Sequence, residues 1–173
     1  RKRLLWKEMS IEKGDFIMAT KNNYFWAEKG ELLANGEIFE VTKLINEESI
    51  YGKEFINIKI KGINNSEERD VVVFKELLES DSPNIKWENL NELYSEITKD
   101  FDYIKSKKEM SSLVLSNKYY NALQVKFSYA VTCHKSQGGQ WDNVFIDLGY
   151  ITKERVNKEF MRWLYTAITR AKK

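Results

Sequence analysis

The sequence predicts a mixed α/β fold in which a small β-barrel comes first, followed by connecting helices and a short α/β segment. Three observations lead to this fold class. Strand-like segments alternate with turn sequences such as Asn35-Gly36 in the first half of the chain, and a helical period of apolar residues begins after Asp81-Ser82-Pro83. From Ala122 onward, strand-like segments precede a final amphipathic helix. Apolar residues make up 42% of the 173 residues and aromatic residues 13%, which favours a folded protein over a disordered chain.

The β-barrel is expected from four short segments with strand patterns, residues 16–20, 37–44, 55–61 and 70–74. The third segment is the clearest, because Ile56, Ile58 and Ile60 alternate with polar residues and would share one face of a sheet. Short strands separated by such turns are typical of small barrels. Before the barrel, residues 1–9 are expected to end a helix, with a turn at Gly14-Asp15.

The second half predicts helices and then strands. Apolar residues fall at helical spacing at Trp87, Leu90, Leu93, Tyr94 and Ile97, and a more charged helix or loop follows to about Met110. One strand face is expected at Val125, Phe127, Tyr129 and Val131, and a second, buried strand at Val144-Phe145-Ile146. The last helix is expected over 157–172, with an apolar stripe at Phe160, Trp163, Leu164, Ala167, Ile168 and Ala171.

Composition narrows the function classes. The formal net charge is only +2, from 28 basic and 26 acidic residues, so any nucleic-acid binding must come from local patches. A single cysteine excludes an intrachain disulfide framework and fits a reducing cytoplasm. No apolar run is long enough to cross a membrane, and no signal-peptide pattern is present. From the single cysteine we expect a cytoplasmic protein. Because the chain begins without Met, we also expect it to be a fragment of a longer protein.

The polar loop 132–139, Thr-Cys-His-Lys-Ser-Gln-Gly-Gly, is the first candidate site. Its lone Cys133 and lone His134 do not supply the four ligands that zinc needs, so no metal site is expected, and adjacent residues cannot form a Cys-His catalytic pair. Lys135 supplies a positive charge, neutral donors surround it, and the Gly138-Gly139 pair lets a ligand approach the backbone. A Walker A sequence occurs nowhere in the chain. The residues alone leave two readings open, an anion-binding loop and a tight turn.

The last helix holds the second candidate, Arg170. At 100° per residue Arg170 lies on the flank of the helix, beside Trp163 rather than opposite the apolar stripe. Such an arginine can reach toward a neighbouring domain, or it can remain at the rim and interact with the helix C-terminus. The helical pattern alone leaves both readings open.

The stretch ALQVKFSYAVTCHKSQGGQWDNVFID, followed by RWLYTAITRA, resembles motifs V and VI of superfamily 1 DNA helicases, and most of all the RecD-like and Dda-like branch. Upstream, GDFIMATKNNYFW and LLANGEIFEV resemble the SH3-like insertion of that branch. The resemblance implies a partial second RecA-like domain without its own P-loop, interrupted by an SH3-like β-barrel. The implied segments are 1–12 (RecA-like), 13–80 (SH3-like), 81–118 (helical connection) and 119–173 (motifs V and VI).

The same resemblance implies an ATP-dependent DNA helicase that translocates 5′ to 3′ on single-stranded DNA and unwinds forked duplexes. ATP and Mg²⁺ would lie between this domain and an N-terminal RecA-like domain of the same parent protein. The implied DNA contacts are Thr132, His134, Lys135 and Ser136. Residues implied to bind ATP or to couple it to DNA are Gln137, Gly138, Gly139, Tyr165 and Thr166, and Arg170 would be the catalytic arginine finger on the γ-phosphate.

Two further expectations concern the insertion and the chain by itself. Asn22, Asn23 and Tyr24 are expected to contact DNA, although the aromatic residues 24–26 could instead fill the barrel core. Because neither a Walker A nor a Walker B motif is present, the 173-residue chain is expected to bind and hydrolyse no ATP alone. The alternatives are an isolated nucleic-acid-binding module and a subunit of an exodeoxyribonuclease-type complex.

Overall fold

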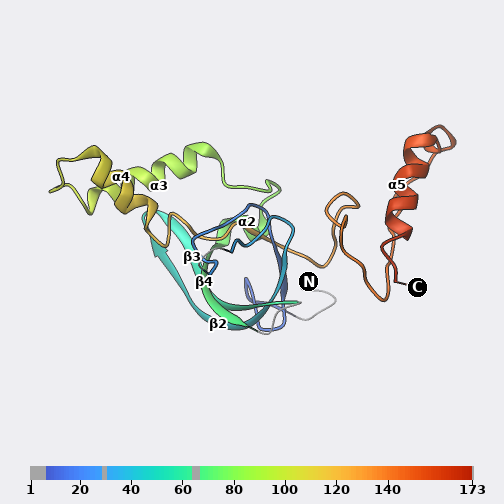
Figure 1. Cartoon of the computed structure of the whole chain (residues 1–173), viewed down its shortest axis with the longest axis horizontal. Coiled ribbons are helices and arrows are strands. Elements are labelled where there is room, and N and C mark those ends of the chain that lie inside the picture. Colours follow the sequence, from blue (N-terminus) through green and yellow to red (C-terminus); the bar gives the residue numbers. More distant parts are fainter. Residues whose placement is uncertain (1–6, 29–30, 64–66, 173) are drawn as a thin grey trace. The chain divides into compact units, whose positions relative to one another are not determined.

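A computed structural model of the chain describes residues 7–28, 31–63 and 67–172 (Figure 1). The chain folds into two compact units, Arg1–Tyr129 and Ala130–Lys173. Most of the expected helix end at residues 1–9 lies outside the described residues, and Lys7, Glu8 and Met9 are not helical. The four domain segments that the resemblance implies, 1–12, 13–80, 81–118 and 119–173, stay a prediction. The division into two units places residues 119–129 in the first unit.

The first unit is built on a five-stranded antiparallel sheet with the strand order β4-β3-β2-β1-β5. Its strands are β1 (Phe16–Ala19), β2 (Ile38–Ile50), β3 (Lys53–Gly62), β4 (Glu68–Phe74) and β5 (Val125–Phe127). Tyr51 and Gly52 connect β2 to β3 with φ angles of 54° and 68°, the conformation of a tight hairpin turn. Two register shifts in β2, between Val41 and Lys43 and between Leu44 and Asn46, mark irregularities of the kind that bend a strand.

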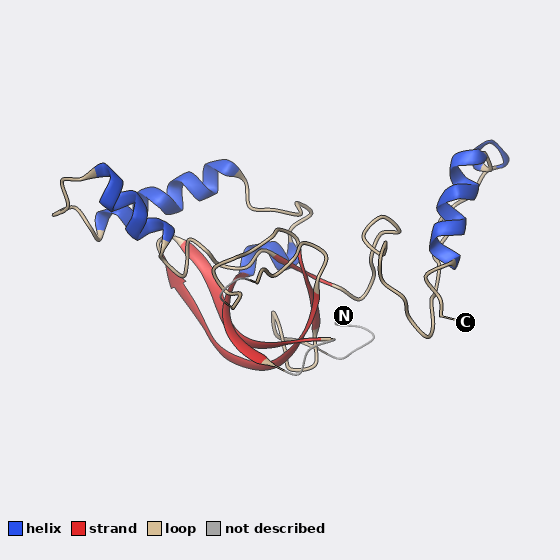
Figure 2. Ribbon diagram, viewed as in Figure 1, coloured by secondary structure: helices blue, strands red, loops and turns tan. Residues whose placement is uncertain are grey.

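The sheet curls but does not close (Figure 2). Between the edge strands β4 and β5, one isolated parallel bridge joins Val73 to Leu123, two residues before β5 begins. The backbone N–H of Leu123 donates to Val72 O at 2.7 Å, and Phe74 N–H donates to Leu123 O at 3.2 Å. Since β5 has only three residues and pairs with β1, it forms no ladder with β4. The expected closed barrel is therefore not confirmed, and the protein has an open, curled sheet.

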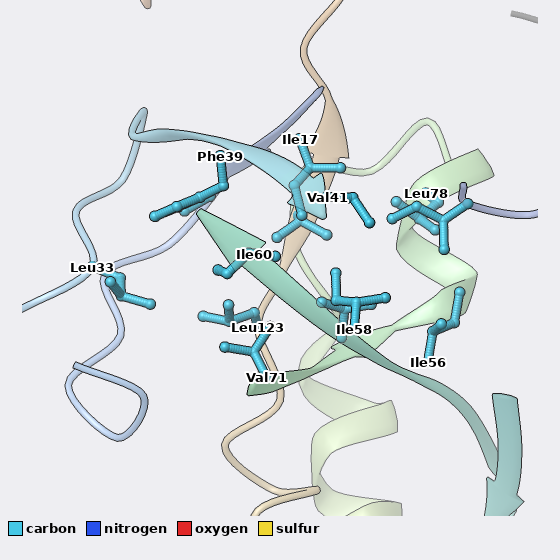
Figure 3. Packing of buried hydrophobic residues seen from close by; sticks show 14 residues of the cluster. Ile17, Leu33, Phe39, Val41, Ile56, Ile58, Ile60, Val71, Leu78 and Leu123 are labelled. Carbon is cyan, nitrogen blue, oxygen red and sulfur yellow. The ribbon is translucent and has the colours of Figure 1, made fainter. Parts of the chain in front are cut away.

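One face of β3 forms the main hydrophobic core. Ile56, Ile58 and Ile60 are fully buried, as their alternation predicts. Figure 3 shows them packed in one cluster with Val41 of the neighbouring strand β2 and with Leu123, which precedes β5. The observed strand β3 extends the predicted segment by two residues at its start and by one at its end.

A second cluster joins three helices to the sheet, α2 (Lys75–Glu79), α3 (Trp87–Lys99) and α4 (Lys107–Leu115). Leu93 and Ile97 of α3 pack there with Phe55 of β3, which confirms the apolar stripe expected for this helix. Trp87, at the start of the stripe, is an exception because 68% of it is exposed.

The second unit contains a 3₁₀ turn, η1 (Lys153–Arg155), and helix α5 (Lys158–Ile168). The side chain of Asn157 caps α5 by accepting a hydrogen bond from Phe160 N at 3.0 Å. The predicted buried strand at 144–146 is wrong for this structure, since these residues form no strand and Phe145 is 98% exposed. The physical reason is that a strand needs a hydrogen-bonded neighbour, and the described residues supply none beside this segment.

The predicted strand around residues 125–131 is shorter than expected. It ends at Phe127, and Tyr129 and Val131 are 43% and 37% exposed. Within the described parts of the chain, no helix has the length and apolar character needed to cross a lipid bilayer.

Candidate functional site

Loop 132–139 is a series of tight turns held by its own backbone. Ser136 N–H donates to Thr132 O at 3.1 Å, and Gly139 N–H donates to Ser136 O at 3.1 Å. The hydroxyl of Ser136 donates to Cys133 O at 2.7 Å, and the residue is only 7% exposed. Ser136 is therefore used to stabilise the loop in this structure. The other polar side chains of the loop, those of Thr132, His134, Lys135 and Gln137, are exposed.

The two glycines of the loop serve different purposes. Gly138 has a φ of +86°, a conformation that other residues rarely adopt. Gly139 lies under the indole ring of Trp141, where a Cβ atom would come within 2.3 Å of Cη2. A larger residue at position 139 would therefore displace the Trp141 ring.

The loop and the end of α5 are joined directly. The Arg170 guanidinium donates from Nη1 to Gly139 O at 3.3 Å, from Nε to Thr166 O at 3.1 Å and from Nη2 to Thr169 Oγ1 at 3.3 Å. The backbone adds a short parallel bridge between Trp141 and Ala171, in which Trp141 N–H donates to Arg170 O at 2.9 Å. Two sequence motifs about 30 residues apart thus form one structure.

Arg170 keeps its charge uncompensated. Its hydrogen-bond partners are neutral oxygens, and among the residues that the structure describes no carboxylate forms an ion pair with it. Residues 132–141 and 166–172 together contain the cations Lys135, Arg170 and Lys172 and no acidic residue. Lys172 alone pairs with a carboxylate, that of Asp142, at 3.0 Å. This local excess of positive charge suits an anionic ligand.

The remaining predicted residues of α5 are arranged around Arg170. Tyr165 is 72% exposed, while the hydroxyl of Thr166 donates to Arg162 O at 3.0 Å. Cys133 lies next to the helix, with Sγ 3.5 Å from Trp163 O. In the described parts of the chain, no group of three or more His, Cys, Asp or Glu side chains is placed to hold a metal ion.

The predicted DNA contacts at 22–24 lie in the first unit, on the loop that follows β1. Asn23 is structural: its backbone pairs with Leu33, its Oδ1 accepts from Phe25 N and Trp26 N, and its Nδ2 donates to Asn121 O at 2.9 Å. Asn22 Oδ1 accepts from Asn35 N at 2.8 Å. In the aromatic run, Trp26 packs against the two hydrophobic clusters, as the core reading expects, while Tyr24 is 69% exposed and its DNA contact stays a prediction.

Trp141 is the residue of the site that the sequence did not single out. Its backbone binds Arg170 and its ring covers Gly139. The only signal was its position, two residues after the glycine pair, where an aromatic ring can cover a residue without a side chain.

Comparisons with known proteins concern mainly the end of the chain. Residues 127–173 match the family model of the UvrD-like helicase C-terminal domain. An uncharacterized protein of Methanocaldococcus jannaschii, MJ1519, is 44% identical over 55 residues, which are 32% of this chain and 4% of that relative. The matched segment is therefore only a small part of that much longer protein. The family match supports, for this C-terminal segment, the resemblance to superfamily 1 DNA helicases that its two motifs indicate.

Proposed function

We propose that the chain is the C-terminal part of an ATP-dependent DNA helicase of the RecD-like and Dda-like branch, in which residues 119–173 belong to a second RecA-like domain and residues 13–80 form an SH3-like module. The parent protein would couple ATP hydrolysis to 5′-to-3′ movement on single-stranded DNA. The observation that carries the proposal is the contact between Arg170 Nη1 and Gly139 O at 3.3 Å.

This contact supports a coupling role because it connects two groups with different tasks. The exposed side chains of Thr132, His134 and Lys135 lie on the loop that ends at Gly139. A shift of the loop when these side chains bind a DNA phosphate would move the Gly139 carbonyl, and with it an oxygen that orients Arg170. We therefore assign Gln137, Gly138 and Gly139 to the coupling of DNA binding to the arginine.

The surroundings of Arg170 fit the terminal phosphate of a bound nucleotide. Its partners are neutral oxygens, so its full positive charge is available to an incoming anion, and its planar donors suit phosphate oxygens. ATP supplies the phosphoryl group whose transfer releases the free energy for movement. Arg170 stabilises the charge that develops during that transfer. Since the sequence contains neither a Walker A nor a Walker B motif, we assign the metal and the triphosphate pocket to the N-terminal RecA-like domain.

The test is the ATPase rate of the parent protein at saturating single-stranded DNA. Arg170→Ala should lower the rate by about 10³–10⁵, the contribution of arginine fingers in phosphoryl transfer. Arg170→Lys should rescue poorly, because an ammonium lacks the planar fork of donors. DNA binding should survive both changes, since the exposed DNA contacts lie on the loop.

The matched control is Arg162→Ala. Arg162 lies on the same helix, is exposed and pairs with Glu159 at 3.4 Å. We expect this variant to keep its ATPase rate. If Arg170→Ala keeps most of its turnover, Arg170 is only a rim arginine and the proposed catalytic role is wrong.

A further inference from the structure

The first unit contains a pocket that the ATPase site does not use. Its volume is about 260 Å³, and it is lined by the loop after β1, the start of α3, residues 120–122 and Gln124. This volume is below the about 300–1,000 Å³ that is usual for drug-sized ligands and cofactors. We call it the aromatic pocket and define it by Lys21, Asn22, Tyr24, Phe25, Trp87 and Gln124.

Three aromatic side chains of the pocket are exposed. Tyr24 and Trp87 are 69% and 68% exposed, and Phe25 is 40% exposed. Phe25 is fixed by an edge-to-face contact with Trp26, with ring centroids 5.0 Å apart. Tyr24 and Trp87 come from segments more than 60 residues apart in the sequence, and their large apolar surfaces contribute little to the core. Flat, exposed rings of this kind can stack on a planar ligand.

The polar groups of the pocket have donors to spare. Gln124 is only 8% exposed, and its Oε1 accepts from Ile85 N at 3.0 Å. Its Nε2 donates to none of the described residues and keeps some access to solvent, so it can donate to a ligand. Asn22 is exposed, its Oδ1 accepts from Asn35 N, and within the described chain its Nδ2 has no acceptor. The side chain of Lys21 forms no ion pair with any described residue.

These features together suit one kind of ligand. Aromatic faces suit a planar group, amide donors that no described residue uses suit a carbonyl edge, and the exposed Lys21 suits a negative charge nearby. An unpaired pyrimidine in a nucleic-acid strand has all three, since its carbonyl oxygens accept hydrogen bonds and its phosphate is anionic.

We propose that the aromatic pocket binds one unpaired pyrimidine of single-stranded DNA, with the base stacked on Trp87 or Tyr24, a base carbonyl accepting from Gln124 and the phosphate near Lys21. The choice of DNA rests on the proposed helicase function. The pocket itself lies wholly in the first unit and needs neither loop 132–139 nor Arg170.

The test uses the 173-residue chain and a fluorescein-labelled oligothymidylate, with binding measured by fluorescence anisotropy. Trp87→Ala should weaken binding about 5- to 150-fold, the range expected when one stacking contact is lost. Tyr103→Ala is the matched control, because Tyr103 is an aromatic residue of similar exposure, 73%, outside the pocket. Circular dichroism checks that both variants keep the fold.

Two further measurements separate the pocket from loop 132–139. An oligonucleotide of the same length with abasic sites keeps the phosphates but lacks bases. Wild type and Trp87→Ala should therefore bind this abasic probe with the same affinity. Lys135→Ala should weaken binding of both probes. Lys21→Gln should reduce the slope of log K against log salt by about 0.7, the value for one phosphate of a single strand.

The proposal is overturned if Trp87→Ala and Tyr24→Ala bind oligothymidylate as wild type does, or if wild type binds the abasic probe equally well. If Lys135→Ala alone weakens binding, the pocket is not a DNA site, while the helicase proposal stands. If the chain binds no oligothymidylate but a peptide with an aromatic residue fills the pocket, the occupant is a protein segment and the DNA proposal is wrong.

Discussion

The two units of the chain are stabilised in different ways. In the first unit, two hydrophobic clusters bury side chains on both faces of the sheet. In the second unit, Ala167 is the only described apolar residue that is buried, while Phe145, Tyr150 and Tyr165 are 98%, 83% and 72% exposed. The second unit is therefore held mainly by backbone hydrogen bonds, by the helix cap of Asn157 and by the Arg170 contacts.

This difference has a functional meaning. A large set of exposed aromatic residues usually marks a surface that another part of the protein or a partner covers. The candidate ATPase residues lie in the unit that lacks a core of its own. Under the proposed function, the N-terminal RecA-like domain would supply the missing surfaces together with the triphosphate pocket. The aromatic pocket, in contrast, lies in the unit that has its own core.

The largest effect is expected from removing a core side chain of the first unit. Phe55 is fully buried, and its ring lies 5.2 Å from that of Phe74 and 5.0 Å from that of Tyr119. Phe55→Ala should lower the free energy of unfolding by about 3–5 kcal/mol, because it leaves a cavity between two rings. The measurement is urea unfolding followed by far-UV circular dichroism.

The control is the same change in the second unit, Phe160→Ala. Phe160 is half-buried and stacks on Trp163 at 5.8 Å, an interaction worth about 0.5–1.5 kcal/mol. The Phe160→Ala variant should leave the unfolding midpoint of the sheet in the first unit unchanged. Equal shifts of one common transition would show that the two units unfold together, and the contrast between them would then be wrong.

A smaller effect is expected from a polar cluster near the end of the first unit. Asp15 is fully buried and accepts hydrogen bonds from Lys7 Nζ at 2.6 Å and from the Tyr129 hydroxyl. Burial lowers the pKa of Lys7, but the hydrogen bond and charge of Asp15 outweigh it, so the pKa lies above 10.5. Burial and then Asp15 raise the pKa of Tyr129 above 10.0.

Both raised pKa values predict that the protein loses stability as the pH rises. The folded protein holds these protons more tightly than the unfolded chain, so the stabilisation is complete below about pH 10 and is lost as the pH rises through the raised pKa values. Asp15→Asn should cost about 1.5–3 kcal/mol at neutral pH, since hydrogen bonds to a charged group are lost. The difference between variant and wild type should shrink above pH 10.

Urea unfolding of both proteins from pH 7 to 11 measures this difference. Tyr51 and Tyr120 also have raised pKa values, caused first by burial, but they contribute to both proteins alike. A difference between the two proteins that stays constant over this range would contradict the assignment to Asp15.

The sequence predicted best those elements whose pattern depends on their own residues. The alternation of Ile56, Ile58 and Ile60 identified β3, and the spacing of Leu93 and Ile97 identified α3. Closure of the sheet was not predictable, because it depends on whether β4 and β5 meet. The strand expected at 144–146 was not found because a strand needs a neighbour, which no local pattern supplies.

The candidate sites show the same limit. The motifs identified Arg170 and the loop, but no pattern indicated that Arg170 binds the carbonyl of Gly139, since every residue has such a carbonyl. Trp87 was expected in the apolar stripe of α3 because its spacing fits. Trp87 is instead exposed, because it is the first residue of the helix. It lies at the pocket that Tyr24 also lines.

The smallest effect is expected at Phe145, the most exposed of the large apolar residues described. Phe145→Ser should change the free energy of unfolding of the 173-residue chain by no more than about 0.5 kcal/mol, the usual range for surface substitutions. The side chain buries almost no area here, so its removal costs little hydrophobic free energy. Urea unfolding measures this value.

The same change in the parent protein sharpens the contrast between the two units. If residues 144–146 pair with strands of a complete RecA-like domain in the parent, Phe145 would be buried there. Phe145→Ser should then destabilise the parent by about 3 kcal/mol or more, as truncation of a buried phenylalanine does. Tyr150→Ser, at a similarly exposed aromatic residue outside the expected strand, serves as the control. If Phe145→Ser is neutral in the parent as well, residues 144–146 form an exposed loop there too, and the expectation of a buried strand at this position is wrong in both proteins.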